Sequence, residues 1–205
     1  MIVIVDYGVG NLNSIRNMLK KAGVSAVISG DRKQVADASK LLLPGMGNFD
    51  NCMQKLNDSG LMETINEKVF NEKVPILGIC VGLQMMMENS EEGQLPGLGW
   101  INGRTIRFKK ELVEKGLKVP NMGWREIKVD KPSRLMTGMD SDSRFYFAHS
   151  YHVSPNDRTD ILIEANYGYD FTAGIEHENI IGVQFHPEKS HRFGYNLLRN
   201  FAFQY

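Results

Sequence analysis

The stretch Val74–Gln84 constrains this chain most, because it sets one cysteine between two glycines where a strand pattern gives way to a helix pattern. Residues 74–80 are apolar and partly β-branched, which predicts a short buried strand. Apolar residues at helical spacing follow it, namely Leu83, Met86 and Met87. The order strand, Gly-x-Cys-x-Gly, helix is that of a nucleophile elbow, a sharp turn that exposes one side chain above a sheet. Cys80 is therefore the candidate nucleophile.

The surroundings of Cys80 favour a nucleophile over a structural thiol. The positive end of the following helix dipole favours a thiolate over a thiol. A packing cysteine in a core strand is the common alternative. Gly78 and Gly82 argue against that alternative, because a core strand gains nothing from glycines on both sides of the cysteine.

Residues 180–188 supply a base and a group to orient it, which a cysteine nucleophile requires. The apolar run 180–185 predicts a strand, and Pro187 favours an extended conformation at His186. In an extended chain, side chains two residues apart leave the same face, so Glu188 would hold the imidazole of His186. Either residue alone would be interpreted as a strand-end histidine or a solvated glutamate. Together with the elbow, they predict a Cys80–His186–Glu188 triad.

These motifs resemble those of the class I, or triad, glutamine amidotransferases. The segments that carry the resemblance span the chain in order: Asp6–Leu12, Pro44–Gly47, Gly78–Gln84, Tyr146–Tyr151, Gln184–Glu188 and His186–Ser190. Within that family the chain is most similar to the glutaminase subunits of imidazole glycerol phosphate synthase. The resemblance implies a flavodoxin-like α/β fold, hydrolysis of L-glutamine to glutamate and ammonia for histidine biosynthesis, and no cofactor.

The resemblance also implies roles for residues outside the triad. The N–H groups near Gly47 and of Val81 would form the oxyanion hole. A pocket for the substrate glutamine would use Gln84, Glu92, Ser150 and Tyr151. The surface that meets a (β/α)8-barrel cyclase subunit, in a heterodimer, would carry Asn11, Trp124, Tyr146 and Lys189.

The segment Pro120–Arg125 departs from the family pattern. Asn121 and Arg125 stand where histidine and asparagine are more usual, and both fall in the segment that carries Trp124. We therefore expect them to retune the partner-facing surface. The alternative partner is a synthase that places an amino or amidino group on a nucleotide-linked sugar for bacterial surface polysaccharides.

Two alternatives from other classes are disfavoured. A cysteine protease or hydrolase on a related fold would not need Gln84, Glu92 and a synthase-facing surface together. A non-catalytic regulator would not need an intact triad. A dinucleotide-binding loop at Gly8 and Gly10 lacks the third glycine of that fingerprint.

Composition excludes several further classes. Lys plus Arg equals Asp plus Glu, at 24 each, so no excess charge points to nucleic acid or an anionic membrane. No apolar stretch approaches the roughly 20 residues of a membrane span. Cys52 and Cys80 are too few for a disulfide framework, and His149 and His152 lack a third ligand for a metal. The cytoplasm is the expected compartment.

The order of patterns predicts one domain over residues 1–205 with a mixed sheet. Apolar strands at 2–5, 25–29, 40–43 and 74–80 alternate with helices, as in an α/β fold with a parallel sheet. From residue 97 the pattern changes to alternating strands at 106–109, 125–129, 145–153, 161–165 and 173–176. These are expected to extend one edge of the sheet in antiparallel order, and a helix at 193–203 ends the chain.

Overall fold

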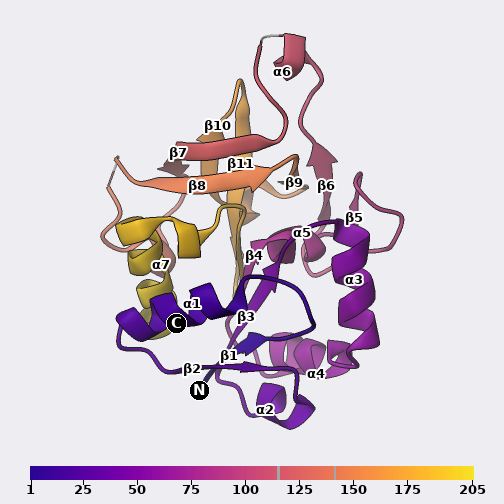
Figure 1. Ribbon diagram of the computed structural model, residues 1–205, viewed down its shortest axis with the longest axis vertical. Coiled ribbons are helices and arrows are strands. Elements are labelled where there is room, and N and C mark those ends of the chain that lie inside the picture. The colour runs from indigo at the N-terminus through magenta and orange to yellow at the C-terminus, as the bar shows by residue number, and fades with distance from the viewer. Residues whose placement is uncertain (115, 141) are drawn as a thin grey trace.

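The computed structural model describes residues 1–114, 116–140 and 142–205 (Figure 1). A mixed sheet of twelve strands runs through them, with the principal order β2-β1-β3-β4-β12-β11-β10-β7-β8. Figure 1 shows α1 and α7 on one side of this sheet and α3 and α4 on the other. This arrangement confirms the α/β prediction. Among the described residues, no helix is both long and apolar enough to span a membrane.

Five parallel strands form one half of the sheet. They are β1 (Ile2–Val5), β2 (Ala26–Ser29), β3 (Lys40–Gly45), β4 (Ile76–Cys80) and β12 (Ile180–Val183). Strands β1, β4 and β12 are buried along their whole length. Parallel strands covered by helices on both faces are expected to be apolar throughout, and these sequences are.

The helices connect and cover these strands. They are α1 (Leu12–Lys21), α2 (Arg32–Ala36), α3 (Phe49–Asp58), α4 (Met62–Asn66), α5 (Val81–Met85), α6 (Glu111–Glu114) and α7 (His191–Gln204). A π-helical turn, η1 (Glu67–Asn71), continues α4, and 3-10 turns occupy η2 (Arg134–Met136), η3 (Arg158–Asp160) and η4 (Pro187–Lys189). Helix α7 buries Leu197, Leu198 and Phe201 along one face, as its spacing predicts.

Antiparallel strands extend the sheet beyond β12, as predicted. They are β11 (Asp170–His177), β10 (Ile161–Asn166), β7 (Asn121–Val129) and β8 (Arg144–His149). A side branch contains β5 (Asn89–Ser90), β6 (Gly103–Arg107) and β9 (Tyr151–Pro155). In Figure 1 this region stands above the parallel half.

The neighbours β4 and β12 bring the two ends of the sequence motif together. They pair in parallel, with Gly182 beside Gly78 and Val183 beside Ile79. The chain beyond β12 therefore emerges at the same sheet edge as Cys80, the last residue of β4. Ligands bind at such carboxyl ends of parallel strands.

The structure corrects three local expectations. The single strand predicted over 145–153 is two strands, β8 and β9, separated at Ser150. Strand β5 and helix α2 were not predicted, because each is too short for a periodic pattern to be recognised. The segment after His186 is the 3-10 turn η4 and not extended chain.

Candidate active site

Cys80 occupies the sharp turn between β4 and α5. Its backbone has φ 57° and ψ −111°, a conformation that a residue with a side chain rarely adopts. Gly82 allows the turn to pack tightly, because a Cβ atom there would lie 1.9 Å from the carbonyl oxygen of Leu43 on β3. Gly78 has a similar constraint, since its Cβ would lie 2.9 Å from the backbone of Gly82. The two glycines and the cysteine thus form the turn that the motif predicts.

His186 and Glu188 lie in hydrogen-bond contact. Nδ1 of His186 is 2.8 Å from Oε1 of Glu188, and both side chains are almost completely buried. The predicted contact is present, but its predicted cause was wrong, since the η4 turn and not an extended chain brings the groups together. Ser190 stabilises this turn by donating to the carbonyl oxygen of His186 at 2.7 Å and accepting from the N–H of Tyr146 at 3.0 Å.

The surroundings of His186 determine its charge. Burial lowers its pKa, but hydrogen bonds with Cys80 and Glu188 and the charges of those groups raise the pKa to about 10. The imidazole is therefore protonated at neutral pH. In that form it can donate a proton to a leaving group beside Cys80.

A cavity of about 160 Å³ opens beside Cys80. It is lined by Gly47, Cys80, Val81, Gln84, Glu92, Pro120, Ala148, His149, Ser150 and Tyr151. The predicted nucleophile, both predicted oxyanion residues and all four predicted substrate residues thus surround one space. Pockets for drug-sized ligands hold roughly 300–1,000 Å³, so this one suits a smaller molecule.

Two polar side chains of the cavity are held by the backbone around them. Oε2 of Glu92 accepts a hydrogen bond from the N–H of Phe49 at 2.9 Å, and burial raises the pKa of this carboxyl group. Nε2 of Gln84 donates to the carbonyl oxygen of Tyr151 at 3.0 Å and to Oε1 of Gln184 at 3.1 Å. Both side chains are thus fixed before any ligand binds.

Gln184 is a site residue that the sequence analysis missed. Its side-chain amide is fully buried and donates to Sγ of Cys80 at 3.7 Å. A polar residue in the otherwise apolar run 180–185 was the available signal, because a buried polar side chain needs a hydrogen-bond partner.

Three of the four predicted interface residues lie together on one surface. The ring centroids of Trp124 and Tyr146 are 6.3 Å apart at nearly right angles, and Nζ of Lys189 lies 5.8 Å from the Tyr146 ring centroid. Trp124 also stacks on His191 at 5.5 Å. Asn11 lies apart from this group in sequence, immediately before α1, which packs against η4.

The expectation that Asn121 retunes this surface was wrong. Side chains alternate along β7, so Asn121 and Arg125 leave the face opposite to Trp124. Asn121 is fully buried, and its Nδ2 lies 3.2 Å from Nε2 of His149, which lines the cavity. Arg125 lies over the ring of Tyr167, with 4.8 Å between its Cζ and the ring centroid.

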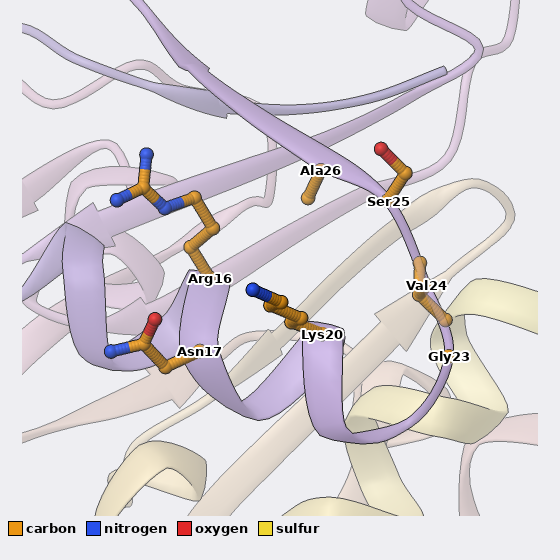
Figure 2. A pocket seen from close by; sticks show the side chains of 7 residues that line it. All are labelled: Arg16, Asn17, Lys20, Gly23, Val24, Ser25 and Ala26. Carbon is orange, nitrogen blue, oxygen red and sulfur yellow. The ribbon is translucent and has the colours of Figure 1, made fainter.

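A larger hollow of about 520 Å³ lies between α1 and the start of β2. Figure 2 shows Arg16, Asn17 and Lys20 on the helix and residues 23–26 on the chain that leads from the helix into β2. All three helix residues are exposed, and a lysine in the last turn of a helix complements the helix dipole. None of the predicted site residues lines this hollow, so it is not the candidate active site.

Comparisons with known proteins agree with this geometry. The family model for glutamine amidotransferase class-I matches residues 3–205. The chain is 46% identical to imidazole glycerol phosphate synthase subunit HisH 2 of Methanococcus maripaludis, covering 100% of both chains. It is 47% identical to HisH 2 of Pseudomonas aeruginosa, covering 98% of each, and 45% identical to HisH of Bdellovibrio bacteriovorus, covering 98% of this chain and 99% of that one.

Solved structures show the same fold at lower sequence identity. A protein described as a GMP synthase component from Thermoplasma acidophilum superposes with a TM-score of 0.73 at 22% identity, covering 98% of this chain and 91% of that one. A glutamine amidotransferase structure gives 0.72 at 16% identity, covering 97% and 99%. The full-length family match and the identities above establish that this chain belongs to the class-I glutamine amidotransferases and, among them, to the HisH subunits.

Proposed function

We propose that this chain is the glutaminase subunit of an imidazole glycerol phosphate synthase. It hydrolyses L-glutamine to glutamate and ammonia and passes the ammonia to a HisF-type (β/α)8-barrel cyclase in the cytoplasm. The observation that carries the proposal is the cavity beside Cys80, together with the buried His186–Glu188 pair, whose imidazole interacts with Cys80.

The geometry supports a two-step reaction. The Cys80 thiolate attacks the side-chain amide carbon of glutamine, and N–H groups near Gly47 and of Val81 hold the oxyanion. His186 donates a proton to the departing nitrogen, which leaves as ammonia, and a thioester remains on Cys80. His186 then takes a proton from water, whose oxygen attacks the thioester to release glutamate. Glu188 orients the imidazole and stabilises its charged form.

The cavity residues support recognition of a free amino acid. The carboxylate of Glu92 complements an α-ammonium group through a charge-assisted hydrogen bond. The Ser150–Tyr151 backbone and Gln84 line the same space and would contact the remaining polar groups. Because burial raises the pKa of Glu92, we expect glutamine affinity to weaken as the pH falls through that pKa.

The curated relatives support the choice of pathway. Those from Methanococcus maripaludis, Pseudomonas aeruginosa and Bdellovibrio bacteriovorus are all named as subunits of imidazole glycerol phosphate synthase. These names do not favour the sugar-modifying alternative. The aromatic surface at Trp124 and Tyr146 supplies side chains of the type that anchor protein interfaces.

Two experiments test the proposal. Glutamine hydrolysis is measured with and without the cyclase from the same genome, with glutamate as the product. Complementation of a histidine auxotroph that lacks its glutaminase subunit, with that cyclase co-expressed, tests the pathway. Glutamate production with growth supports the proposal. Glutamate production without growth would mean that the ammonia passes to another acceptor. An absence of glutamine hydrolysis would overturn the proposed chemistry.

A further inference from the structure

A chain of hydrogen bonds, buried at its centre, joins Arg125 to the wall of the glutamine cavity. Nε of Arg125 donates to Oδ1 of Asn121 at 3.1 Å, and Nδ2 of Asn121 lies 3.2 Å from Nε2 of His149. Nδ1 of His149 lies 2.7 Å from the carbonyl oxygen of Tyr151. Asn121 and His149 are 0% and 5% exposed, so water does not compete for these groups.

The direction of each hydrogen bond follows from chemistry. The Tyr151 carbonyl can only accept, so Nδ1 of His149 carries a proton. In a neutral imidazole the other nitrogen must then accept, and it receives the N–H of the Asn121 amide. The amide oxygen of Asn121 is left to accept from Arg125, whose guanidinium only donates. This assignment of donors and acceptors gives every polar group in the chain a hydrogen-bond partner.

Several features keep His149 neutral. Burial, together with the nearby charges of His152, His186 and Arg125, lowers its pKa to about 3, despite the hydrogen bond to Tyr151. The rings of Phe108, Phe147 and Phe171 surround it at centroid distances of 5.1, 5.5 and 5.4 Å. An apolar setting of this kind disfavours an imidazolium.

Arg125 is itself held at fixed points. Its Nη1 donates to the carbonyl oxygen of Trp124 at 2.8 Å, and its guanidinium lies 4.8 Å from the ring centroid of Tyr167. A guanidinium held in this way presents its Nε–H in a defined direction. It therefore orients the amide of Asn121.

The Tyr151 carbonyl is the point where this chain meets the site. The carbonyl oxygen of Ser150 accepts from Phe108, so the antiparallel alternation turns the N–H and C=O of Tyr151 away from β6. That carbonyl receives two donors, Nδ1 of His149 and Nε2 of Gln84. Both donors act on the Ser150–Tyr151 backbone, which lines the cavity.

We propose that Arg125, Asn121 and His149 are positioning residues that hold the Ser150–Tyr151 backbone in the conformation that binds glutamine. This inference rests on the proposed glutaminase function. It gives the two unusual residues of the segment 120–125 a role in the substrate site, on the face of β7 opposite to Trp124. Because these residues do not touch the reacting amide, they affect glutamine binding more than the rate of the chemical step.

The decisive variant is Asn121→Asp, which keeps the shape and replaces the donor with an acceptor. With His149 protonated, both ring nitrogens donate and the contact to Tyr151 survives. With His149 neutral, its single proton must face either the introduced carboxylate or the Tyr151 carbonyl, so one contact is lost. The variant should therefore show a KM for glutamine that rises about tenfold with increasing pH, the cost of roughly one buried hydrogen bond. The kcat should stay within about twofold.

Two further variants control for general damage to β7. Asn121→His should keep the wild-type KM and its pH profile, since a neutral imidazole also offers one donor and one acceptor. Glu126→Gln alters an exposed neighbour on the same strand and should change neither parameter. All four proteins are assayed as complexes with the cyclase. An Asn121→Asp variant with the wild-type KM at every pH would overturn the inference, as would an equal loss in the Asn121→His variant.

A measurement without turnover separates this inference from the proposed function. Nitrogen-15 chemical shifts of the His149 ring in the wild-type protein should show the neutral tautomer protonated at Nδ1 at pH 7, and a charged ring in Asn121→Asp at low pH. A ring protonated at Nε2 in the wild type would overturn the hydrogen-bond chain even if the enzyme is fully active. Absence of glutaminase activity in the wild type, with the expected tautomer present, would instead count against the proposed function.

Discussion

Nδ1 of His186 lies 2.8 Å from Oε1 of Glu188, because the 3-10 turn η4 that follows His186 contains Glu188. The second carboxylate oxygen, Oε2, is buried and has no hydrogen-bond partner among the described residues. A carboxylate with one satisfied oxygen in a buried site depends strongly on its charged partner. The protonation of His186 therefore depends on the conformation of η4, which places Glu188 beside the imidazole.

Replacement of Cys80 by serine should abolish glutamine-dependent turnover. A serine hydroxyl is far less ionised than a cysteine thiol near neutral pH, so the nucleophile is lost. The reaction of the cyclase with added ammonium salt should persist in the same complex. The matched control is Cys52→Ser, which alters the other buried cysteine, outside the cavity lining. Glutamine-dependent turnover in the Cys80 variant would rule out the triad.

Replacement of Glu188 by glutamine should narrow the pH range of activity. Burial lowers the pKa of His186, and contacts with Cys80 and Glu188 raise it to about 10, so the wild type should keep a protonated imidazole well above neutral pH. Without the Glu188 charge, that pKa falls. The alkaline limb of the pH–rate profile should move to lower pH, and an unshifted limb would contradict the role of Glu188.

The same variant should lose stability in a defined pH window. A His186 pKa raised from 6.5 to about 10 contributes stability that is fully present below about pH 6.5 and is lost as the pH rises through about 10. Urea unfolding should therefore show the Glu188→Gln variant less stable by about 2 kcal/mol at pH 6, with a smaller difference near pH 10. An equal loss of stability at pH 6 and at pH 10 would mean that the His186–Glu188 pair does not titrate as described.

Replacement of Gly47 by alanine should reduce glutamine hydrolysis through the backbone alone. Gly47 has φ +92°, and a Cβ there would meet nothing within 4 Å, so the substitution strains the backbone without a clash. Gly60 is a matched control, with φ +70° and equally open space. Each substitution should cost roughly 1–2 kcal/mol of stability. Only Gly47→Ala should lower kcat, on the order of 10²-fold if the oxyanion donor is displaced. Equal kcat values would remove Gly47 from the oxyanion hole.

Replacement of Trp124 by alanine should weaken association with the cyclase by about 2 kcal/mol. Trp124 packs against Tyr146 and His191 and is 37% exposed, so it presents a rigid aromatic surface. Met122→Ala is the control, because Met122 is two residues away on the same face of β7 and is 59% exposed. Titration calorimetry compares the two variants. Similar affinities of the two variants for the cyclase would mean that the cyclase binds at a surface other than that of Trp124.

The sequence by itself determined the local elements and the reactive groups. The glycines around Cys80 permit the tight turn between strand and helix that exposes the cysteine. The apolar runs of β1, β4 and β12 require strands covered on both faces. Such features depend on residue type and spacing within a few positions, which is the range over which a sequence pattern carries information.

Only the tertiary structure decided which of these groups meet. The pairing of β4 with β12 brings His186 to Cys80, and contacts between residues distant in sequence leave no periodic signal. Two further contacts also join residues that are distant in sequence. They are the hydrogen bond from Gln184 to Cys80 and the contact of buried Asn121 with His149. Asn121 is the first residue of β7, and it lies on the more buried of the two faces of that strand. Which face of β7 turned inward was decided by the side chains that cover it, where Asn121 lies against His149 and Arg125 against Tyr167.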